Sequence, residues 1–292
     1  DCSLTKLNQM RLLIVLLFST LTFCAQAQSM DSVAKVLEEV YHSDQAPRAA
    51  IDSIGKRYGY DSEEMRSHWK HIHQSDSINL SIVRSIIDRF GWLSAKETSK
   101  KGNEVLFLVI QHADLSTQLH YLPILKSAVS QGKARAKDYA YLQDRINTSQ
   151  GKFQVYGSQF HGGPSGNMHL YPIMDEPNVN KRRKKVGLAP LETYAKEMGV
   201  VYQVPKKDVY KNKIVIFGIL ADKEQKPLTG AEVYCNIELL ATTDSFGEYV
   251  AIIDKKKTAS GLTFKKHGYK SFLFPLTEQK DVYTFMFLLD KE

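Results

Sequence analysis

The stretch "VPKKDVYKNKIVIFGIL", residues 204–220, marks the point at which the sequence changes its periodicity. Its first part is polar and contains a proline, as linkers do, whereas its second part is a run of β-branched, apolar and aromatic residues. Before this stretch apolar residues recur mostly at helical spacing, and after it they alternate as in strands. The sequence therefore predicts a multidomain α + β protein, with a mostly α-helical N-terminal domain followed by an all-β antiparallel sandwich.

The strand-like part continues from residue 213 to residue 289 as a series of short apolar runs separated by turn residues. This spacing is typical of a small antiparallel sandwich. One of the runs, "AEVYCNIE" at residues 231–238, predicts a single strand.

The helical part carries its own start and stop signals. Pro47 predicts the start of a second helix, and Ser116 predicts the N-cap of a later one. The apolar run "LFLVIQHAD", residues 106–114, is ambiguous by periodicity alone, but its helical neighbours favour a helix. Between residues 153 and 174, "FQVYGSQF" and "NMHLYPIM" flank the loop "HGGPSG", a pattern that predicts a small β-hairpin within the helical domain.

Residues 1–27 predict upstream residues followed by a signal peptide, because a basic start at Met10 precedes a short apolar core and a small-x-small end. Cleavage is expected after Ala27, with residues 1–9 lying upstream of the natural start. The bulky residue before Cys24 makes lipidation the less favoured alternative. We therefore expect an exported protein, periplasmic or extracellular after cleavage near Ala27, with no membrane span in the mature chain.

The predicted organisation has four parts: residues 1–27, a helical domain at 28–205, a linker at 206–212 and the sandwich at 213–292. A hydrophobic content of 43% and a charged content of 24% indicate a globular chain. The net charge of +7 suits an anionic partner, but export and the lack of aromatic–basic interleaving argue against nucleic acid. Cys235 is the only cysteine of the predicted mature chain, so we expect it to pack in a core without a disulfide.

Three motifs follow one another after the linker: "KPLTGAEV" at 226–233, "TTDSFGEY" at 242–249 and "FKKHGYKS" at 264–271. Together they resemble the carboxypeptidase regulatory-like domain, a transthyretin-like or immunoglobulin-like β-sandwich common in exported bacterial proteins. The resemblance covers roughly residues 213–289. It implies an accessory module that holds, orients or binds, and it implies no catalytic residues.

The helical part contains a second ordered series of motifs, which includes "DQAPR" at 44–48, "SDSINL" at 75–80, "VIQHAD" at 109–114, "YLQDRI" at 141–146 and "GKFQVYGSQ" at 151–159. The series resembles a bacterial domain family of unknown function, from about Asp44 to Met198. Leu93 stands where that family usually has Pro, and Ser158 stands where it usually has Thr. The resemblance implies a layout of helices and no known reaction.

Three of the polar residues in these motifs are catalytic candidates, namely His112, Asp114 and Asp144. Imidazole titrates near neutral pH, so a histidine suits general acid or base chemistry. Asp114 or Asp144 is expected to accept a hydrogen bond from His112 and fix its tautomer. The corresponding site would be a cleft between the end of the His112 helix and the hairpin.

The ligand-binding candidates are the other polar residues placed beside apolar neighbours, namely Arg145, Gln154, Tyr156, Gln159, Asp76, Asn79, Asp44 and Arg48. Arg145 suits bidentate binding of a carboxylate or phosphate. Gln154 and Tyr156 would share one face of a strand. Asp76 and Asn79 would share one face of a helix. For the residues around the hairpin, an equally weighted interpretation is a buried hydrogen-bond network that fixes the hairpin to the helices. For Asp76, Asn79, Asp44 and Arg48, the favoured interpretation is that they cap and bridge helices.

No metal or cofactor is predicted. His68 and His71 lie one helical turn apart, but His73 faces away from them and no carboxylate completes a recognised ligand spacing. The basic run "KRRKK" at 181–185 predicts a solvated helix face.

The favoured function is that of a ligand-binding or interaction protein of the cell envelope, which takes a small polar or anionic ligand or an envelope component. The alternative is a hydrolase-like enzyme that uses His112 with Asp114 or Asp144 as general acid and base. No serine or cysteine lies in a nucleophile elbow, so an acyl-enzyme is not expected. The sequence leaves open whether the protein is an enzyme and what its oligomeric state is.

Overall fold

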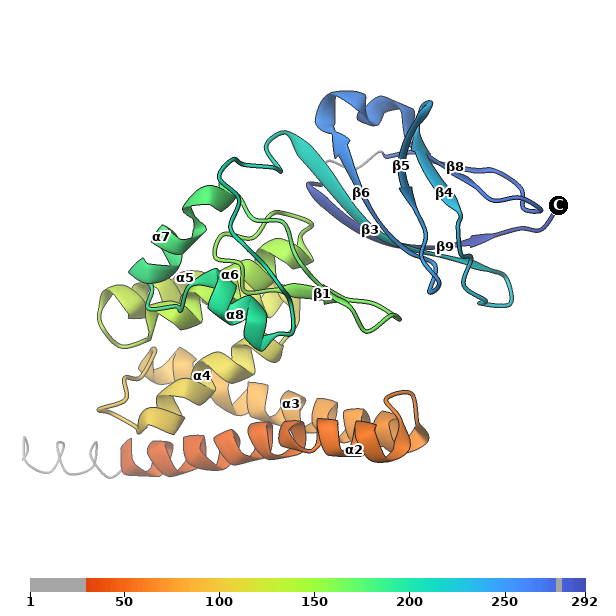
Figure 1. The fold of residues 1–292 in the computed structure, drawn as a ribbon. Coiled ribbons are helices and arrows are strands. Elements are labelled where there is room, and N and C mark those ends of the chain that lie inside the picture. The colour runs from red at the N-terminus through yellow and green to blue at the C-terminus, as the bar shows by residue number, and fades with distance from the viewer. Residues whose placement is uncertain (1–29, 277–279) are drawn as a thin grey trace, which may run out of the picture. The chain divides into compact units, whose positions relative to one another are not determined.

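The computed structural model describes residues 30–276 and 280–292 (Figure 1). The predicted signal peptide at residues 1–27 lies outside the described residues. The chain divides into two compact units, of which the first ends at Arg135 and the second comprises Ala136–Glu292. This division falls earlier along the chain than the linker predicted at residues 206–212, which lies inside the second unit.

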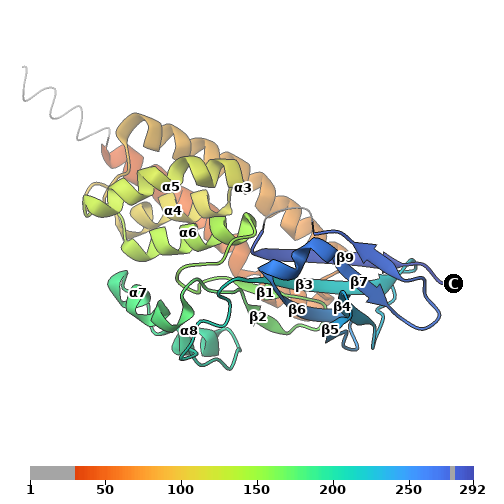
Figure 2. The ribbon, with the colours of Figure 1, turned by 90° about the horizontal axis from the view of Figure 1, so that it is seen from above.

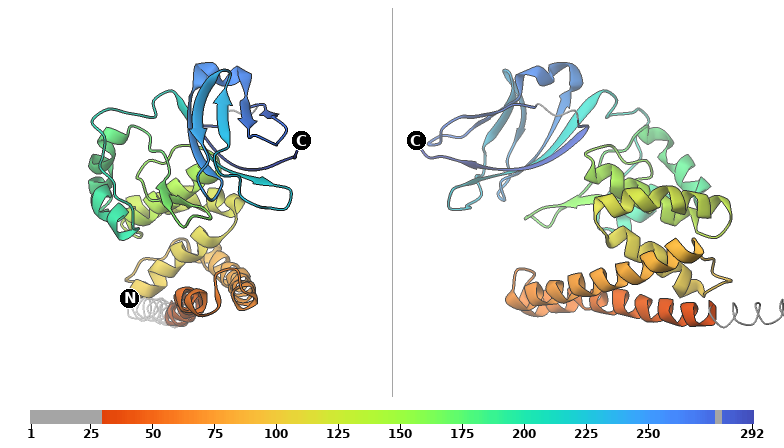
Figure 3. Two further views of the ribbon diagram at one scale, coloured as in Figure 1. Left: turned by 45° about the vertical axis from the view of Figure 1, so that its right-hand side comes forward. Right: turned by 180° about the vertical axis from the view of Figure 1, so that it is seen from behind.

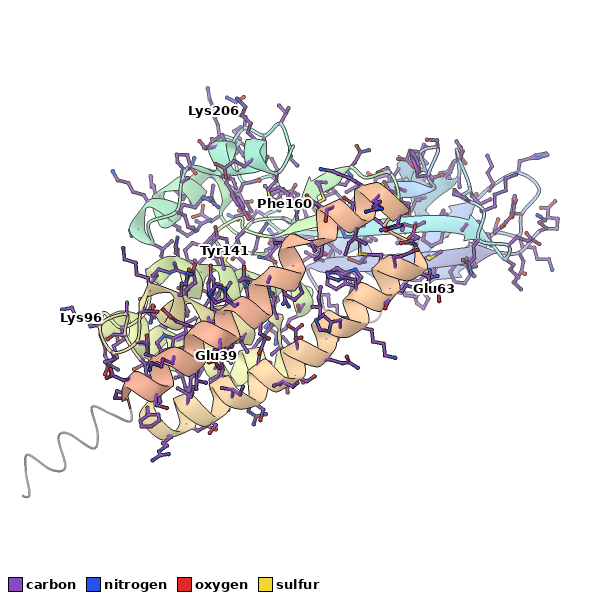
Figure 4. The ribbon with its side chains drawn as sticks, turned by 90° about the horizontal axis from the view of Figure 1, so that it is seen from below. Glu39, Glu63, Lys96, Tyr141, Phe160 and Lys206 are labelled. Atoms are coloured by element: carbon purple, nitrogen blue, oxygen red, sulfur yellow. The ribbon has the colours of Figure 1, made fainter. Side chains whose placement is uncertain are left out.

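The first unit is built from helices. They are the helix of residues 30–49, α2 (Ile51–Tyr58), α3 (Glu63–Phe90), α4 (Lys100–His112) and α5 (Leu115–Ser130). The helix of residues 30–49 continues into α2 and runs antiparallel to the long helix α3 (Figure 4). Ser62 caps α3, because its hydroxyl accepts from the Met65 N–H at 3.1 Å.

Apolar side chains from four of these helices form the core of the first unit. Leu37, Val83, Leu106, Ile110 and Leu125 are all fully buried. Burial of each such side chain stabilises the fold by about 1.5–3 kcal/mol. The prediction that the apolar run ending at His112 is a helix is confirmed.

Two predicted helix starts in the first unit are wrong. Pro47 does not open a helix, because the helix of residues 30–49 runs through it. The fixed φ of proline is compatible with helical backbone, so only one backbone hydrogen bond is lost there. The N-cap of α5 is Asp114 and not Ser116, since the Asp114 carboxylate accepts from the Thr117 N–H at 2.8 Å.

The second unit begins with α6 (Ala136–Ser149). It is followed by a short antiparallel hairpin of β1 (Phe160–Gly162) and β2 (Met168–Leu170) and by η1 (Glu176–Asn178), α7 (Val179–Lys185) and α8 (Leu191–Glu197). The predicted hairpin is thus confirmed but is shorter than expected. Residues 154–158 form no strand apart from a single bridge between Gln154 and Ile173, so the expectation that Gln154 and Tyr156 share a strand face is wrong.

Two sheets complete the second unit (Figures 2 and 3). Their elements are β3 (Lys213–Asp222), β4 (Glu232–Cys235), β5 (Glu238–Thr242), β6 (Glu248–Asp254), η2 (Lys255–Ser260), β7 (Leu262–Lys265), β8 (Phe272–Phe274) and β9 (Val282–Leu289). One sheet has the order β6-β3-β9 and the other the order β5-β4-β7-β8. Side chains from both sheets share one apolar core, to which Ile216, Val233 and Phe264 contribute.

The predicted α + β class is therefore confirmed, with a helical region followed by a sandwich-like pair of sheets. Two details differ from the expectation. The pair β3–β9 is parallel, so the sheets are not purely antiparallel. The run 231–238 forms two strands, because Asn236 adopts a left-handed conformation (φ 56°) and turns the chain between β4 and β5. Cys235 is buried, as predicted.

Among the described residues, no helix combines the length and the apolar character that crossing a membrane requires.

Candidate functional site

The first unit brings His112 next to Asp44. His112 is the last residue of α4, and its Nδ1 lies 3.3 Å from Oδ1 of Asp44 in the helix of residues 30–49. The hydrogen bond expected between His112 and Asp114 or Asp144 is thus not the one that the structure has. Asp114 is held at the N-terminus of α5, and the Asp144 carboxylate is bonded within the second unit.

Arg48 joins Asp44 to a third helix. Its Nη2 donates to both carboxylate oxygens of Asp76 in α3, at 2.8 and 3.0 Å. Its Nη1 donates to the backbone carbonyl of Asp44 at 2.8 Å and to the carboxylate at 3.2 Å. Asp44, Arg48, Asp76 and His112 therefore form one polar group from three helices, called here the His112 cluster.

The His112 cluster includes three of the predicted ligand-binding residues, and Asn79 lies beside it. Asn79 is 2% exposed, and its Oδ1 accepts from the hydroxyl of Ser43, the residue that precedes Asp44. Its Nδ2 is buried and has no hydrogen-bond partner among the described residues. Since amide oxygen and nitrogen are exchanged by a 180° rotation, Asn79 offers either a donor or an acceptor at this place.

The Asp44 carboxyl is ionised in this setting. Burial raises its pKa, but hydrogen bonds from His112 and Gln45 and the charge of Arg48 outweigh burial, so its pKa lies below the ordinary value. An ionised carboxylate only accepts hydrogen bonds, so Nδ1 of His112 carries the proton that lies between them. In the neutral imidazole the other nitrogen, Nε2, is then an acceptor with a free lone pair.

The Nε2 atom has no partner in the described part of the chain, and the His112 side chain is 21% exposed. This is the arrangement of a general base, with a carboxylate on one ring nitrogen and an unoccupied second nitrogen. The same arrangement binds a ligand that donates an O–H or N–H group.

The His112 cluster also has the residue types of a metal site. One ligand atom each from Asp44, Asp76 and His112 lies within 4.8 Å of the others. The Arg48 guanidinium, however, already bonds to both carboxylates. A divalent cation would have to displace this charge, so the contacts favour the cluster as an ion-pair network over a metal centre.

The lowered pKa of Asp44 predicts acid sensitivity of the first unit. A carboxyl whose pKa is lower in the folded than in the unfolded state stabilises the fold above its unfolded pKa, which is about 3.8. That contribution is lost as the pH falls through the folded value. We therefore expect urea unfolding followed below pH 3.8 to show a steeper loss of stability for the wild type than for Asp44→Asn. Asp52→Asn, at an exposed position of α2, is the control, and an equal slope for all three proteins would contradict the assignment.

The second unit gathers the other predicted residues around Asp144. Asp144 is fully buried in α6 and accepts from the N–H groups of Val155, Tyr156 and Ser158 at 2.6–3.1 Å. The Ser158 hydroxyl donates to the same carboxylate at 3.0 Å. Burial raises the pKa of Asp144, and these donors act in the opposite direction. The carboxylate thus shapes the segment 155–158, which is why that segment forms no strand.

Gln154 and Gln159 belong to the same arrangement. The Gln154 Oε1 accepts from the Gln159 N–H at 2.8 Å, and its Nε2 donates to the carbonyls of Gln159 and Tyr171. The Gln159 amide donates to the Ser158 hydroxyl at 3.1 Å. Since Gln154 is fully buried and bonded at both ends, these contacts favour the buried-network interpretation for it.

Two arginines of the basic run 181–185 take part in this arrangement. Arg183 is 1% exposed, so the prediction that the whole run is a solvated face is wrong at that residue. Its guanidinium donates to the carbonyls of Ala189 and Tyr156 at 2.6 and 2.7 Å. Arg182 donates to the Val155 carbonyl at 2.8 Å. The two side chains hold the carbonyl side of the segment whose N–H side is held by Asp144.

A further feature of the second unit was not predicted from the sequence. A cavity of about 210 Å³ lies between the β1–β2 hairpin and strands β3 and β6. His161 and His169, which face one another across the hairpin, line it together with Glu248. In the sequence, the two histidines on either side of the Gly-rich turn were the available signal for a polar site at the hairpin. The approach of Glu248 could not be read from the sequence, because it depends on how the hairpin lies on the sheet.

Comparisons with known proteins give one informative match. The sequence model of a family described as Family of unknown function (DUF6624) matches residues 33–207, more than half of the chain. No curated protein matches the chain. Among solved structures, the chain is similar to part of a 9R-lipoxygenase from Cyanothece PCC8801, with 15% identity over 40% of this chain and 23% of that one. The TM-score of 0.23 is too low for this likeness to carry an argument.

Proposed function

The chain belongs to the family of unknown function DUF6624, and we propose that its helical region binds a small polar ligand at the His112 cluster. The observation that carries this proposal is the pairing of His112 with Asp44 through Nδ1, which leaves Nε2 without a protein partner on a partly exposed side chain. The residues come from three motifs that are far apart in the sequence, at 44–48, 75–80 and 109–114.

The contacts of the cluster indicate which ligand groups it suits. Nε2 of a neutral His112 accepts a hydrogen bond, so the matching group on the ligand is a hydroxyl, an amine or a water molecule. Because Arg48 balances one of the two carboxylates, the four side chains carry one net negative charge when the imidazole is neutral. A polar ligand that is neutral or positively charged therefore suits this cluster better than an anion.

A second candidate function is supported by the same pair of residues. With Asp44 on Nδ1, His112 is positioned to take a proton from a water molecule at Nε2 while the water oxygen attacks an acyl or phosphoryl centre. The proton is then available to the leaving group, so the reaction is a hydrolysis without a covalent enzyme intermediate. In this proposal Asp44 has the role that the sequence predicted for Asp114 or Asp144.

We further propose that the protein is exported and acts in the cell envelope. The support is the basic start, apolar core and Ala25-Gln26-Ala27 end of the first 27 residues. The motifs within residues 226–271 support an accessory role for the sheets of the second unit, because they resemble the carboxypeptidase regulatory-like domain. In this proposal the sheets hold an envelope component as a second partner. Mass spectrometry of the secreted or periplasmic protein is expected to find an N-terminus at Gln28.

His112→Gln tests the binding site directly. Glutamine keeps a polar side chain of similar length but lacks the paired imidazole, so we expect affinity for a ligand of the cluster to fall about 10- to 100-fold. Ligands are found by the rise in melting temperature that wild type shows with sugars, amines, amino acids or nucleosides. Hydrolysis of simple ester and phosphoester substrates is measured on the same proteins.

His71→Gln is the matched control, because His71 is exposed on α3 and has no contact of this kind. It is expected to behave as wild type. If a folded His112→Gln protein keeps both the binding and the activity of wild type, the cluster is not the site. Binding that is lost without any measurable hydrolysis in wild type would leave the binding function and remove the hydrolase.

A further inference from the structure

Arg145 is an arginine without a counter-ion. It lies on α6, one residue after Asp144, and its side chain has no hydrogen bond or ion pair with any described residue. Its Nε atom is buried without a partner. The side chain as a whole is half-buried, and this partial burial lowers the pKa of the guanidinium.

Such an arrangement is costly for the folded protein. A guanidinium stays charged at any physiological pH, so it cannot escape burial by losing its proton. A charge that is partly withdrawn from water without a partner is destabilising, and proteins therefore pair such charges with opposite charges or with ligands. Arg145 thus points to an anion that the protein itself does not supply.

Two carboxylates of this part of the second unit, those of Asp144 and Glu192, are already engaged. The side chains of Asp144 and Arg145 leave α6 in different directions, because adjacent helical residues point about 100° apart. The Asp144 carboxylate is bonded to the segment 155–158. Glu192 accepts from the Asn180 amide at 2.8 Å and from the Val204 N–H. Neither carboxylate forms an ion pair with Arg145.

The surroundings of Arg145 are aromatic and basic. Tyr141 lies one helical turn before it, and the Tyr141 ring lies 6.4 Å from the ring of Tyr194 in α8. Tyr194 is close enough to Arg145 for each to affect the other's pKa. The guanidinium of Arg183, which is buried, lies over Tyr194 at 5.0 Å from the ring centre. All of its hydrogen bonds go to neutral carbonyls.

We propose that Arg145 is the anchor of an anion-binding site in the second unit, which takes a carboxylate or phosphate group of a small molecule. The planar guanidinium binds either group through two parallel hydrogen bonds. Arg183 adds a second positive charge near Tyr194, while its own N–H groups stay bonded to backbone carbonyls. The site shares no residue with the His112 cluster. It prefers an anion, whereas the cluster prefers a neutral or positively charged group.

The test uses the full chain and inorganic phosphate, methyl phosphate and acetate as probes, with chloride at equal ionic strength as the reference. For wild type we expect one of the probes to raise the melting temperature in a saturable way, by about 3–5 °C at ten times its dissociation constant. A response to phosphate and methyl phosphate identifies a phosphoryl ligand, whereas a response to acetate alone identifies a carboxylate. Arg145→Met is expected to abolish the response.

Arg145→Met also has an expected effect without any probe. Because no protein contact of the guanidinium is lost, the variant should melt at the wild-type temperature or higher in chloride alone. Arg57→Met, which removes an exposed arginine from the last turn of α2, is expected to keep the full response to the probe. His112→Gln should also keep it, so that failure of this site and failure of the His112 cluster are distinguishable.

Three results would overturn the proposal. The first is a response that is equal in wild type and Arg145→Met, and the second is a wild type that responds to no probe beyond the chloride reference. The third is a marked destabilisation of Arg145→Met in chloride, because it would mean that the guanidinium has a structural partner.

Discussion

Asp144→Ala is expected to lower the free energy of unfolding of the second unit by about 3–5 kcal/mol. The substitution removes the acceptor of the Val155, Tyr156 and Ser158 N–H groups and of the Ser158 hydroxyl, all of which lie at 2.6–3.1 Å. Asp144 is fully buried, so water does not replace the lost acceptor. The expected loss is smaller than the sum over four separate bonds, because the freed segment can partly rearrange.

Asp144→Asn is expected to lower the free energy of unfolding less than Asp144→Ala does. The asparagine amide keeps one oxygen, which can serve either the Val155 side or the Ser158 side, while its NH₂ group faces donors. We therefore expect about half the loss of the alanine variant. Urea unfolding followed by circular dichroism measures both, and Glu197→Ala, at an exposed position of α8, is the control with an expected change below about 0.5 kcal/mol. A loss for Asp144→Ala no greater than that of the control would show that the segment does not depend on this carboxylate.

Arg183→Met has the second largest expected effect, a loss of about 2–4 kcal/mol in the stability of the second unit. Methionine retains much of the volume, but the bonds from the guanidinium to the carbonyls of Ala189, Tyr156 and Gly157 are lost. The contact with the Tyr194 ring at 5.0 Å is lost with them. Arg183→Lys is expected to be nearly as destabilising, since a single ammonium group cannot donate to the Ala189 and Tyr156 carbonyls in the way that the planar guanidinium does.

Lys184→Met is the matched control for Arg183→Met, because Lys184 is the next residue of the same helix and is exposed. Its expected change is small. Combination of Arg183→Met with Asp144→Ala should cost less than the sum of the two single losses, since both side chains hold the segment 155–158. A strictly additive double variant would contradict the shared role, and a large loss for Lys184→Met would mean that charge and not the buried contacts matters in α7.

Local sequence signals were sufficient to predict most helices and strands. Capping serines, glycines at helix ends and alternating apolar residues act over a few positions, so they are present in the sequence itself. The missed turn at Asn236 shows the limit of that reasoning within a single motif. Asparagine tolerates a left-handed conformation, and this property was a readable signal that the run 231–238 is two strands.

The candidate site was predicted only in part. The sequence singled out His112, Asp44, Arg48 and Asp76 as candidate site residues, and it placed Asp76 on one helix face with Asn79. It assigned the carboxylate partner of His112 to Asp114 or Asp144. The partner is instead Asp44, which lies 68 positions away and became available because the first helix continues through Pro47.

By itself the sequence determined which regions are helical, which are strand-like and which residues carry chemistry, because those properties depend on neighbours within about one turn of helix or a few residues of strand. The tertiary structure alone decided which polar groups meet. It paired His112 with Asp44, placed Asp144 under the segment 155–158, buried Arg183 within a basic run and set β9 parallel to β3. These outcomes follow from the packing of elements distant in sequence, where a buried polar group must find whichever partner the core brings to it.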